Sequence, residues 1–226
     1  MTLLGGRVQG DVDAGAGNDS VFVSDFPSPA PVLDVEDILG GIGADTIVVD
    51  AGTVGGGIFG DDTDGDASDD GADSICVVGN LVGIQVEDVF GEGGRDTIIV
   101  SNAVAGNIFG GDENSPGDSI LVGEGATVAS VDGGTGEDTI RVLGGTVTGN
   151  VLGGDETPDG GIEGDLIEIA NGSAGGFASV GGNVAGNDGD DTITVSGSST
   201  ITGSVGGNAG NDSISITGGT IVGHWQ

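Results

Sequence analysis

Aspartate residues recur along this chain in a constant local setting, with glycines just before them and an alternating aliphatic segment just after. The segment from Gly133 to Arg141 reads G-G-x-G-x-D-x-U-x, where U is a large aliphatic residue, and the segment from Gly40 to Val48 fits without a mismatch. Glycine permits positive φ, so such a loop can turn its carbonyls towards one point that the aspartate carboxylate closes. A shell made only of oxygen suits a hard cation such as calcium.

Nine aspartates occupy this place when the chain is aligned on Asp-[Thr/Ser/Leu]-[Ile/Val]: Asp19, Asp45, Asp73, Asp96, Asp118, Asp138, Asp165, Asp191 and Asp212. Insertions stretch the loops before Asp73, Asp118 and Asp165, and the other six loops match better. The residues predicted to hold calcium are Asp19, Gly40, Gly41, Gly43, Asp45, Gly91, Gly93, Asp96, Gly133, Gly134, Gly136, Asp138, Asp188, Asp191 and Asp212, followed by Asp73, Asp118 and Asp165 in the stretched loops. The alternative is that the aspartates only cap turns through backbone hydrogen bonds.

The elements that position these loops follow from the spacing, because the aspartates are separated by 20 to 28 residues, with one strand and one loop in each period. Such a period is typical of a solenoid. Alternation turns a pair of Val or Ile residues inward in each first strand: Val21/Val23, Ile47/Val49, Ile75/Val77, Ile98/Val100, Ile120/Val122, Ile140/Val142, Ile167/Ile169, Ile193/Val195 and Ile214/Ile216. A second strand after a glycine corner supplies Val8/Val12, Val54/Ile58, Val104/Ile108, Val128/Val131, Val147/Val151 and Ile201/Val205. We predict an all-β protein, a single parallel β-helix or β-roll of about nine turns with negligible helix.

These repeats resemble the glycine- and aspartate-rich calcium-binding repeats of RTX (repeats-in-toxin) proteins. The resemblance implies a calcium-loaded β-roll and export from the cell, hence an extracellular or cell-surface location. The chain departs from the family in one respect, since the nonapeptide occurs once in each turn instead of twice. Calcium ions, several of them, are therefore expected along one edge only.

One domain, residues 1–226, is expected. A proline-rich surface excursion at 24–31 and acidic loop insertions at 61–70, 112–116 and 155–163 interrupt the repeat.

Charge excludes several classes of function. The chain has 37 acidic residues against three arginines and no lysine, a net charge of −34, so nucleic acid is an unsuitable partner. Stacked carboxylates about 4.8 Å apart repel by roughly 3.5 kcal/mol at an effective dielectric of about 20, and few basic groups are present to offset this.

The sequence contains no apolar segment long enough for membrane insertion. One histidine, one cysteine and no tyrosine argue against an enzyme, with a polysaccharide-active β-helix enzyme as a remote alternative.

Two features predict contacts with other chains. The outward residues Phe22, Val48, Cys76, Ile99 and Leu121 form an apolar stripe, a possible lateral contact or a surface that the proline-rich excursion covers. The segment ending at Trp225 shares its phase in the repeat with the segment from Arg7 to Val12. We therefore expect a structural protein that self-assembles head to tail into a filament, surface layer or matrix fibre, with Trp225 at the junction. The alternative is a calcium-dependent spacer, folding module or adhesin fragment of a larger secreted protein.

Overall fold

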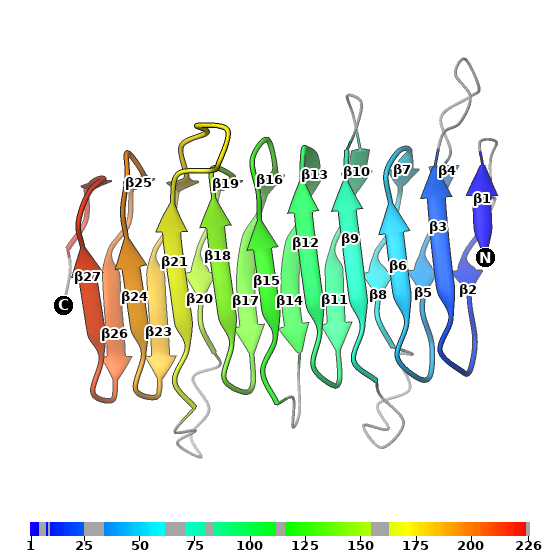
Figure 1. The fold of residues 1–226 in the computed structure, drawn as a ribbon, viewed down its shortest axis with the longest axis horizontal. Coiled ribbons are helices and arrows are strands. Elements are labelled where there is room, and N and C mark those ends of the chain that lie inside the picture. The colour runs from blue at the N-terminus through cyan, green and yellow to red at the C-terminus, as the bar shows by residue number, and fades with distance from the viewer. Residues whose placement is uncertain are drawn as a thin grey trace.

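The computed structural model describes residues 1–4, 8, 10–24, 34–61, 71–79, 84–111, 116–154 and 163–224. These residues contain no helix, and their strands wind into a parallel solenoid of about eight turns, close to the nine expected (Figure 1). Residues 25–33, 62–70, 112–115 and 155–162, which hold most of the proline-rich excursion and of the acidic insertions, lie outside the described residues, as does Trp225.

The first sheet, sheet A, contains the strand that follows each aspartate. Its strands in spatial order are β1 (Thr2–Leu4), β3 (Ser20–Ser24), β6 (Thr46–Val49), β9 (Ser74–Val78), β12 (Thr97–Ser101), β15 (Ser119–Val122), β18 (Thr139–Leu143), β21 (Leu166–Ala170), β24 (Thr192–Val195) and β27 (Ser213–Ile216). Every pair is parallel and in register with the repeat, as in Ile98 opposite Ile120 and Ile120 opposite Ile140. Sheet A therefore confirms the strand predicted from the D-x-U pattern.

The second half of each turn forms two sheets instead of the single bent strand that we expected. Sheet B consists of β4 (Asp34–Val35), β7 (Thr53–Val54), β10 (Ile84–Val86), β13 (Ala103–Ala105), β16 (Thr127–Val128), β19 (Thr146–Val147), β22 (Ser179–Val180), β25 (Thr200–Ile201) and β28 (Thr220–Ile221). Sheet C consists of β2 (Val12–Asp13), β5 (Ile38–Leu39), β8 (Ile58–Phe59), β11 (Val89–Glu92), β14 (Asn107–Gly111), β17 (Ser130–Gly134), β20 (Val151–Leu152), β23 (Val184–Asp188) and β26 (Val205–Ala209). The solenoid therefore has three sides.

The core is a stack of β-branched side chains, as predicted for the strands of sheet A. Sixteen of the eighteen inward Val and Ile residues are at most 2% exposed, and only Ile214 and Ile216 of the last turn are more accessible. Full burial of one such side chain stabilises the fold by about 1.5–3 kcal/mol. The prediction for Val104 was wrong: it points outward on β13 and is 48% exposed, because the buried positions of that strand belong to Ala103 and Ala105.

The outer faces carry two apolar columns. On sheet A the register Phe22–Val48–Cys76–Ile99–Leu121 places the predicted stripe in one line, with each side chain partly exposed. The line continues into Arg141 and Glu168, whose Nε and Oε2 atoms are 3.1 Å apart. On sheet C, three phenylalanines that the sequence analysis did not single out stack with ring centroids 4.9 and 5.0 Å apart, namely Phe59, Phe90 and Phe109. Contact of the sheet A stripe with another chain stays a prediction.

Candidate functional site

The nine motif aspartates form one continuous column at the corner between sheets C and A, which we call the aspartate ladder. In each rung the backbone N–H of one aspartate donates to Oδ1 of the aspartate in the next turn, from Asp19 to Asp212, at N···O distances of 2.6 to 3.0 Å. The seven internal members are at most 3% exposed, and Asp19 and Asp212 at the two ends are partly exposed. The turn-capping role of these carboxylates is therefore present in every rung.

The second carboxylate oxygen, Oδ2, fills the place that a side chain would take on a glycine in, or just after, a strand of sheet C. A Cβ added to Gly133 would lie 2.3 Å from Oδ2 of Asp138, and one added to Gly91 would lie 2.5 Å from Oδ2 of Asp96. Eight glycines have this relation to the ladder: Gly40, Gly60, Gly91, Gly110, Gly133, Gly153, Gly186 and Gly207. The first glycine of the motif is thus required because the carboxylate occupies its side-chain position.

The other two motif glycines are required by their backbone angles. In the loop from Gly133 to Asp138, the second position, Gly134, has φ +93° and the fourth, Gly136, has φ +109°. The same two positions have positive φ in the loops before Asp19, Asp45, Asp96, Asp191 and Asp212. Glycine adopts these angles without a steric penalty, and asparagine tolerates them better than most residues. All six loops that match the motif well therefore share one backbone conformation.

At six rungs, those of Gly40, Gly60, Gly91, Gly110, Gly133 and Gly153, the place that a glycine Cβ would take is bordered by both an Oδ2 atom and a backbone carbonyl of the following turn. The position of a Cβ on Gly40 would be 2.6 Å from Oδ2 of Asp45 and 2.2 Å from the carbonyl oxygen of Gly60, and Gly133 relates Asp138 to Gly153 in the same way. Oδ2 of Asp45, Asp96, Asp138 and Asp191 is buried without a hydrogen-bond donor. Two hydrogen-bond acceptors in one buried place repel, and either a proton on the carboxyl or a bound cation removes the conflict.

The electrostatics of the ladder reflect this conflict. Burial is the main cause that raises the pKa values, to about 9 for Asp96, about 8 for Asp138 and about 7 for Asp165, from an ordinary value of 3.8. The backbone hydrogen bond to Oδ1 acts in the opposite direction, and neighbouring carboxylates raise the pKa values further. Burial likewise raises the pKa values of Asp45 and Asp191. The buried carboxyls of the ladder therefore hold protons more tightly than free carboxyls do.

Three further parts of the predicted site are located by the structure, and their binding of calcium stays a prediction. Asp73, Asp118 and Asp165, which follow stretched loops, occupy the ladder in the same way as the others and are 2–3% exposed. Gly93 does not have the special conformation, which belongs to the next residue, Gly94, with φ +100°. Asp188 lies at the end of β23 outside the ladder. The glycines that we missed are Gly60, Gly110, Gly153, Gly186 and Gly207. Gly186 and Gly207 stand five residues before their aspartates, as Gly133 does, and the other three follow from aligning the stretched loops on the glycine instead of on the aspartate.

The donor set of the corner fits calcium in its chemistry. Carboxylate and carbonyl oxygens are the ligands that calcium prefers, and the loop carbonyls of adjacent turns stack, so that a Cβ on Gly41 would lie 2.1 Å from the carbonyl oxygen of Gly15. Among the described residues, no three carboxylate, imidazole or thiol side chains converge at one point. An ion at this corner would therefore take one or two carboxylates of the ladder and complete its shell with loop carbonyls.

Replacement of Gly133 by alanine tests the tight relation between glycine and carboxylate. The new Cβ would lie 2.0 Å from the Gly153 carbonyl oxygen and 2.3 Å from Oδ2 of Asp138, so both must move. We expect Gly133→Ala to lower the free energy of unfolding by about 1–3 kcal/mol, as overpacked substitutions do. The matched control is Gly55→Ala, whose Cβ would meet only the Val35 carbonyl oxygen, at 3.7 Å. Equal denaturation midpoints for the two variants would contradict this account.

Comparison with protein-family models, with curated proteins and with solved structures found no match for this chain. Within the described part of the chain, no helix is suited to cross a membrane.

Proposed function

We propose that this protein is a calcium-stabilised structural solenoid of the RTX type. The observation that carries the proposal is the set of buried acceptors at the ladder, where Oδ2 of Asp45, Asp96 and Asp138 has no hydrogen-bond donor and borders the same glycine Cβ position as a backbone carbonyl of the next turn. Calcium offsets this repulsion at several rungs at once, and its binding free energy becomes folding free energy. Sites built mainly from carbonyls are of low affinity and suit a medium rich in calcium, which supports an extracellular or cell-surface location.

Calcium binding is tested best by a substitution that keeps the hydrogen bond and removes the charge. In Asp138→Asn, Oδ1 still accepts from the N–H of Asp118 while the amide nitrogen can donate towards the Gly153 carbonyl. We expect this variant to bind fewer calcium ions than the wild type, as measured by equilibrium dialysis or isothermal titration calorimetry. Asp37→Asn is the matched control. Oδ1 of Asp37 accepts a hydrogen bond of 2.7 Å from the N–H of Gly57, and this pair lies at another corner of the solenoid. An unchanged number of bound ions in Asp138→Asn would reject the ladder as the calcium site.

We also propose that the solenoids join head to tail. In the last turn Ile216 is 40% exposed, whereas Val195, its partner in the turn before, is fully buried. β27 and β1 are the two edge strands of sheet A, at opposite ends of the rod (Figure 1). Because all strands are parallel, β27 of one copy, which pairs on one side only among the described strands, has the right polarity to pair with β1 of the next. A heterologous contact that does not close into a ring propagates as a fibre, and this is the assembly that we propose.

Assembly is expected to depend on the apolar surface of the last turn. Ile216→Lys places a charge in the contact and is expected to convert filaments into short rods, as seen by electron microscopy and sedimentation velocity in calcium. Thr217→Lys, one residue further and also exposed, is the control that keeps assembly. Rods of one subunit in the wild type at high concentration would reject assembly and favour a spacer or folding module of a larger secreted protein.

A further inference from the structure

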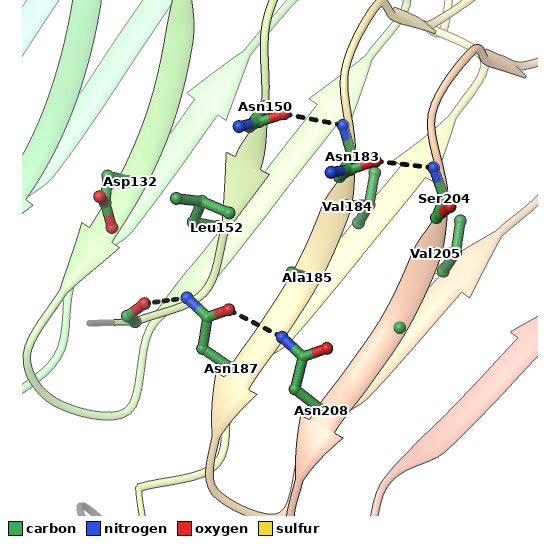
Figure 2. A pocket seen from close by; sticks show the side chains of 12 residues that line it. Asp132, Asn150, Leu152, Asn183, Val184, Ala185, Asn187, Ser204, Val205 and Asn208 are labelled. Carbon is green, nitrogen blue, oxygen red and sulfur yellow. Dashed lines mark hydrogen bonds between the residues drawn. The ribbon is translucent and has the colours of Figure 1, made fainter. Parts of the chain in front are cut away.

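The outer face of sheet C bears a groove of about 500 Å³, and none of the nine ladder aspartates lines it (Figure 2). It runs across β20, β23 and β26, along the long axis of the rod. Its floor is formed by Leu152, Ala185 and Gly206, which occupy the same outward position in three successive turns. A volume of this size is within the usual range for small-molecule sites, about 300–1,000 Å³.

The groove exists because the outward column of sheet C loses volume towards the last turns. In the earlier turns this column is filled by the stacked rings of Phe59, Phe90 and Phe109. After Phe109 it continues through Asp132 to the leucine, alanine and glycine of the floor. The backbone register is unchanged, so the hollow comes from the choice of side chains alone.

One wall is a row of side chains at the corner between sheets B and C. Oδ1 of Asn150 accepts from the N–H of Asn183, and Oδ1 of Asn183 accepts from the N–H of Ser204, both at 2.9 Å (Figure 2). These bonds hold the two amide planes in a constant orientation. The Nδ2 groups of Asn150 and Asn183 donate no hydrogen bond to another described residue, and both side chains are exposed. They are free to donate to a ligand.

The opposite wall results from a substitution in the repeat motif. At the second motif position, with φ near +80°, the last two turns carry Asn187 and Asn208, where earlier loops carry Gly41 and Gly134. Nδ2 of Asn187 donates to the Gly154 carbonyl, and its Oδ1 accepts from Nδ2 of Asn208 at 3.0 Å. Oδ1 of Asn208 accepts no bond from another described residue, and the side chain is exposed. Glycine alone satisfies the positive φ at this position, so the backbone conformation does not require the amide side chains of Asn187 and Asn208.

We propose that this groove binds an uncharged oligosaccharide. Its walls offer neutral donors, Nδ2 of Asn150 and Asn183, and a neutral acceptor, Oδ1 of Asn208, a combination that suits hydroxyl groups because each hydroxyl both donates and accepts. The hydrocarbon surface of Leu152 and Ala185 suits the C–H face of a sugar ring. Successive wall groups repeat at the strand spacing of about 4.8 Å, so the groove suits a linear polymer.

The charge distribution selects against other occupants. The net charge of −34 and the Asp132 carboxylate at one end of the groove repel uronate, sulfate and phosphate polymers. A peptide that binds by strand addition needs backbone donors and acceptors from a sheet edge, and the groove lies on the face of sheet C, where the backbone groups pair with adjacent turns. The charge and the neutral amide walls favour a neutral glycan as the occupant.

A glycan array containing neutral and uronate oligosaccharides tests the proposal, with the full chain kept in calcium. We expect binding to one or more neutral glycans and none to uronates; isothermal titration calorimetry with the neutral oligosaccharide bound best then gives its affinity. No neutral glycan bound, or uronates bound equally well, would overturn the proposal.

Two pairs of variants place the binding in the groove. Ala185→Phe extends the phenylalanine column and fills the floor, and we expect at least a tenfold loss of affinity, whereas Thr194→Phe, outward on sheet A, has no effect.

Asn208→Gly removes the exposed amide while keeping positive φ, and we expect a loss of affinity of about fivefold, the effect of one neutral hydrogen bond. Asn102→Gly, with φ +49° at a different corner, is its control. Affinity that is equal in Ala185→Phe and the wild type, at equal melting temperature, would place the glycan elsewhere and overturn the assignment.

Discussion

In calcium-free buffer the protein is expected to become more stable as the pH falls from about 9 to about 5, the reverse of ordinary acid denaturation. The buried carboxyls of Asp96, Asp138 and Asp165 have pKa values of about 9, 8 and 7 in the folded protein, against 3.8 as the ordinary value. The folded chain therefore binds more protons than the unfolded chain between these values. Linkage then requires the free energy of unfolding to fall as the pH rises through this interval.

The expected effect is large. For Asp138 the difference between about 8 and 3.8 corresponds to a contribution on the order of 5 kcal/mol, fully present below pH 3.8 and lost as the pH rises through about 8. The net stability of a domain is about 5–15 kcal/mol. Ionisation of two or three rungs is therefore expected to unfold the metal-free solenoid.

Circular dichroism melts at several pH values with a chelator present measure this effect. Repulsion among the exposed acidic residues also lowers the stability as the pH rises. Molar NaCl screens this repulsion and leaves the buried ladder largely unaffected. Asp96→Asn removes one buried ionisation and is expected to flatten the pH profile. A wild-type melting temperature that rises with pH, or a profile that molar NaCl abolishes, would contradict protonation of the ladder.

At about pH 8, calcium is expected to raise the melting temperature by tens of degrees and to release protons as it binds. Both effects follow if calcium and protons occupy the same carboxyls, because a carboxyl must lose its proton before it ligates a metal. Calorimetric titrations in two buffers with different heats of protonation give the number of protons released per ion. At about pH 5, where protons already neutralise Asp96, Asp138 and Asp165, the calcium effect is expected to be much smaller.

Magnesium at the same concentration separates specific ligation from general screening. Magnesium demands regular octahedral geometry and gives up its water reluctantly, so we expect only weak stabilisation by it. Equal stabilisation by magnesium, or calcium binding without proton release, would show that the ions only screen surface charge. Retention of the full melting temperature in chelator at about pH 8 would reject calcium as the stabilising ion.

Much of the fold can be predicted from the sequence because each turn of a solenoid repeats the same short pattern of residues. The spacing of Asp96, Asp118 and Asp138 places one turn above another, and the alternation Ile98–Ile99–Val100 decides which side chains enter the core. Equal side chains in equal positions make the parallel register the only arrangement that buries them all. The aspartate column, the core of sheet A and the outer apolar stripe follow from these local patterns.

Whether the second half of the turn is one bent strand or two sheets depends on short corners that leave no distinct pattern. The pairs Val54/Ile58 and Val147/Val151 are buried in either arrangement, and Val104 was misplaced because Ala103 and Ala105 look like weaker core residues than valine. The side that a short strand turns inward is decided by its neighbours in adjacent turns. In this case the neighbours are the strands containing Gln85 and Thr127.

The amino-acid sequence by itself determined the solenoid, its period and the nine aspartates, because these depend on residues close together in the chain. Only the tertiary structure decided what the aspartates face, because the partner of each one lies a whole turn away. The N–H of Asp118 meets Asp138 20 residues on, and the carbonyl beside Oδ2 of Asp138 belongs to Gly153. The amide walls of the groove arise in the same way, because Asn150 and Asn183 meet across 33 residues. Interactions between turns depend on loop lengths that differ from turn to turn, and a local motif does not contain them.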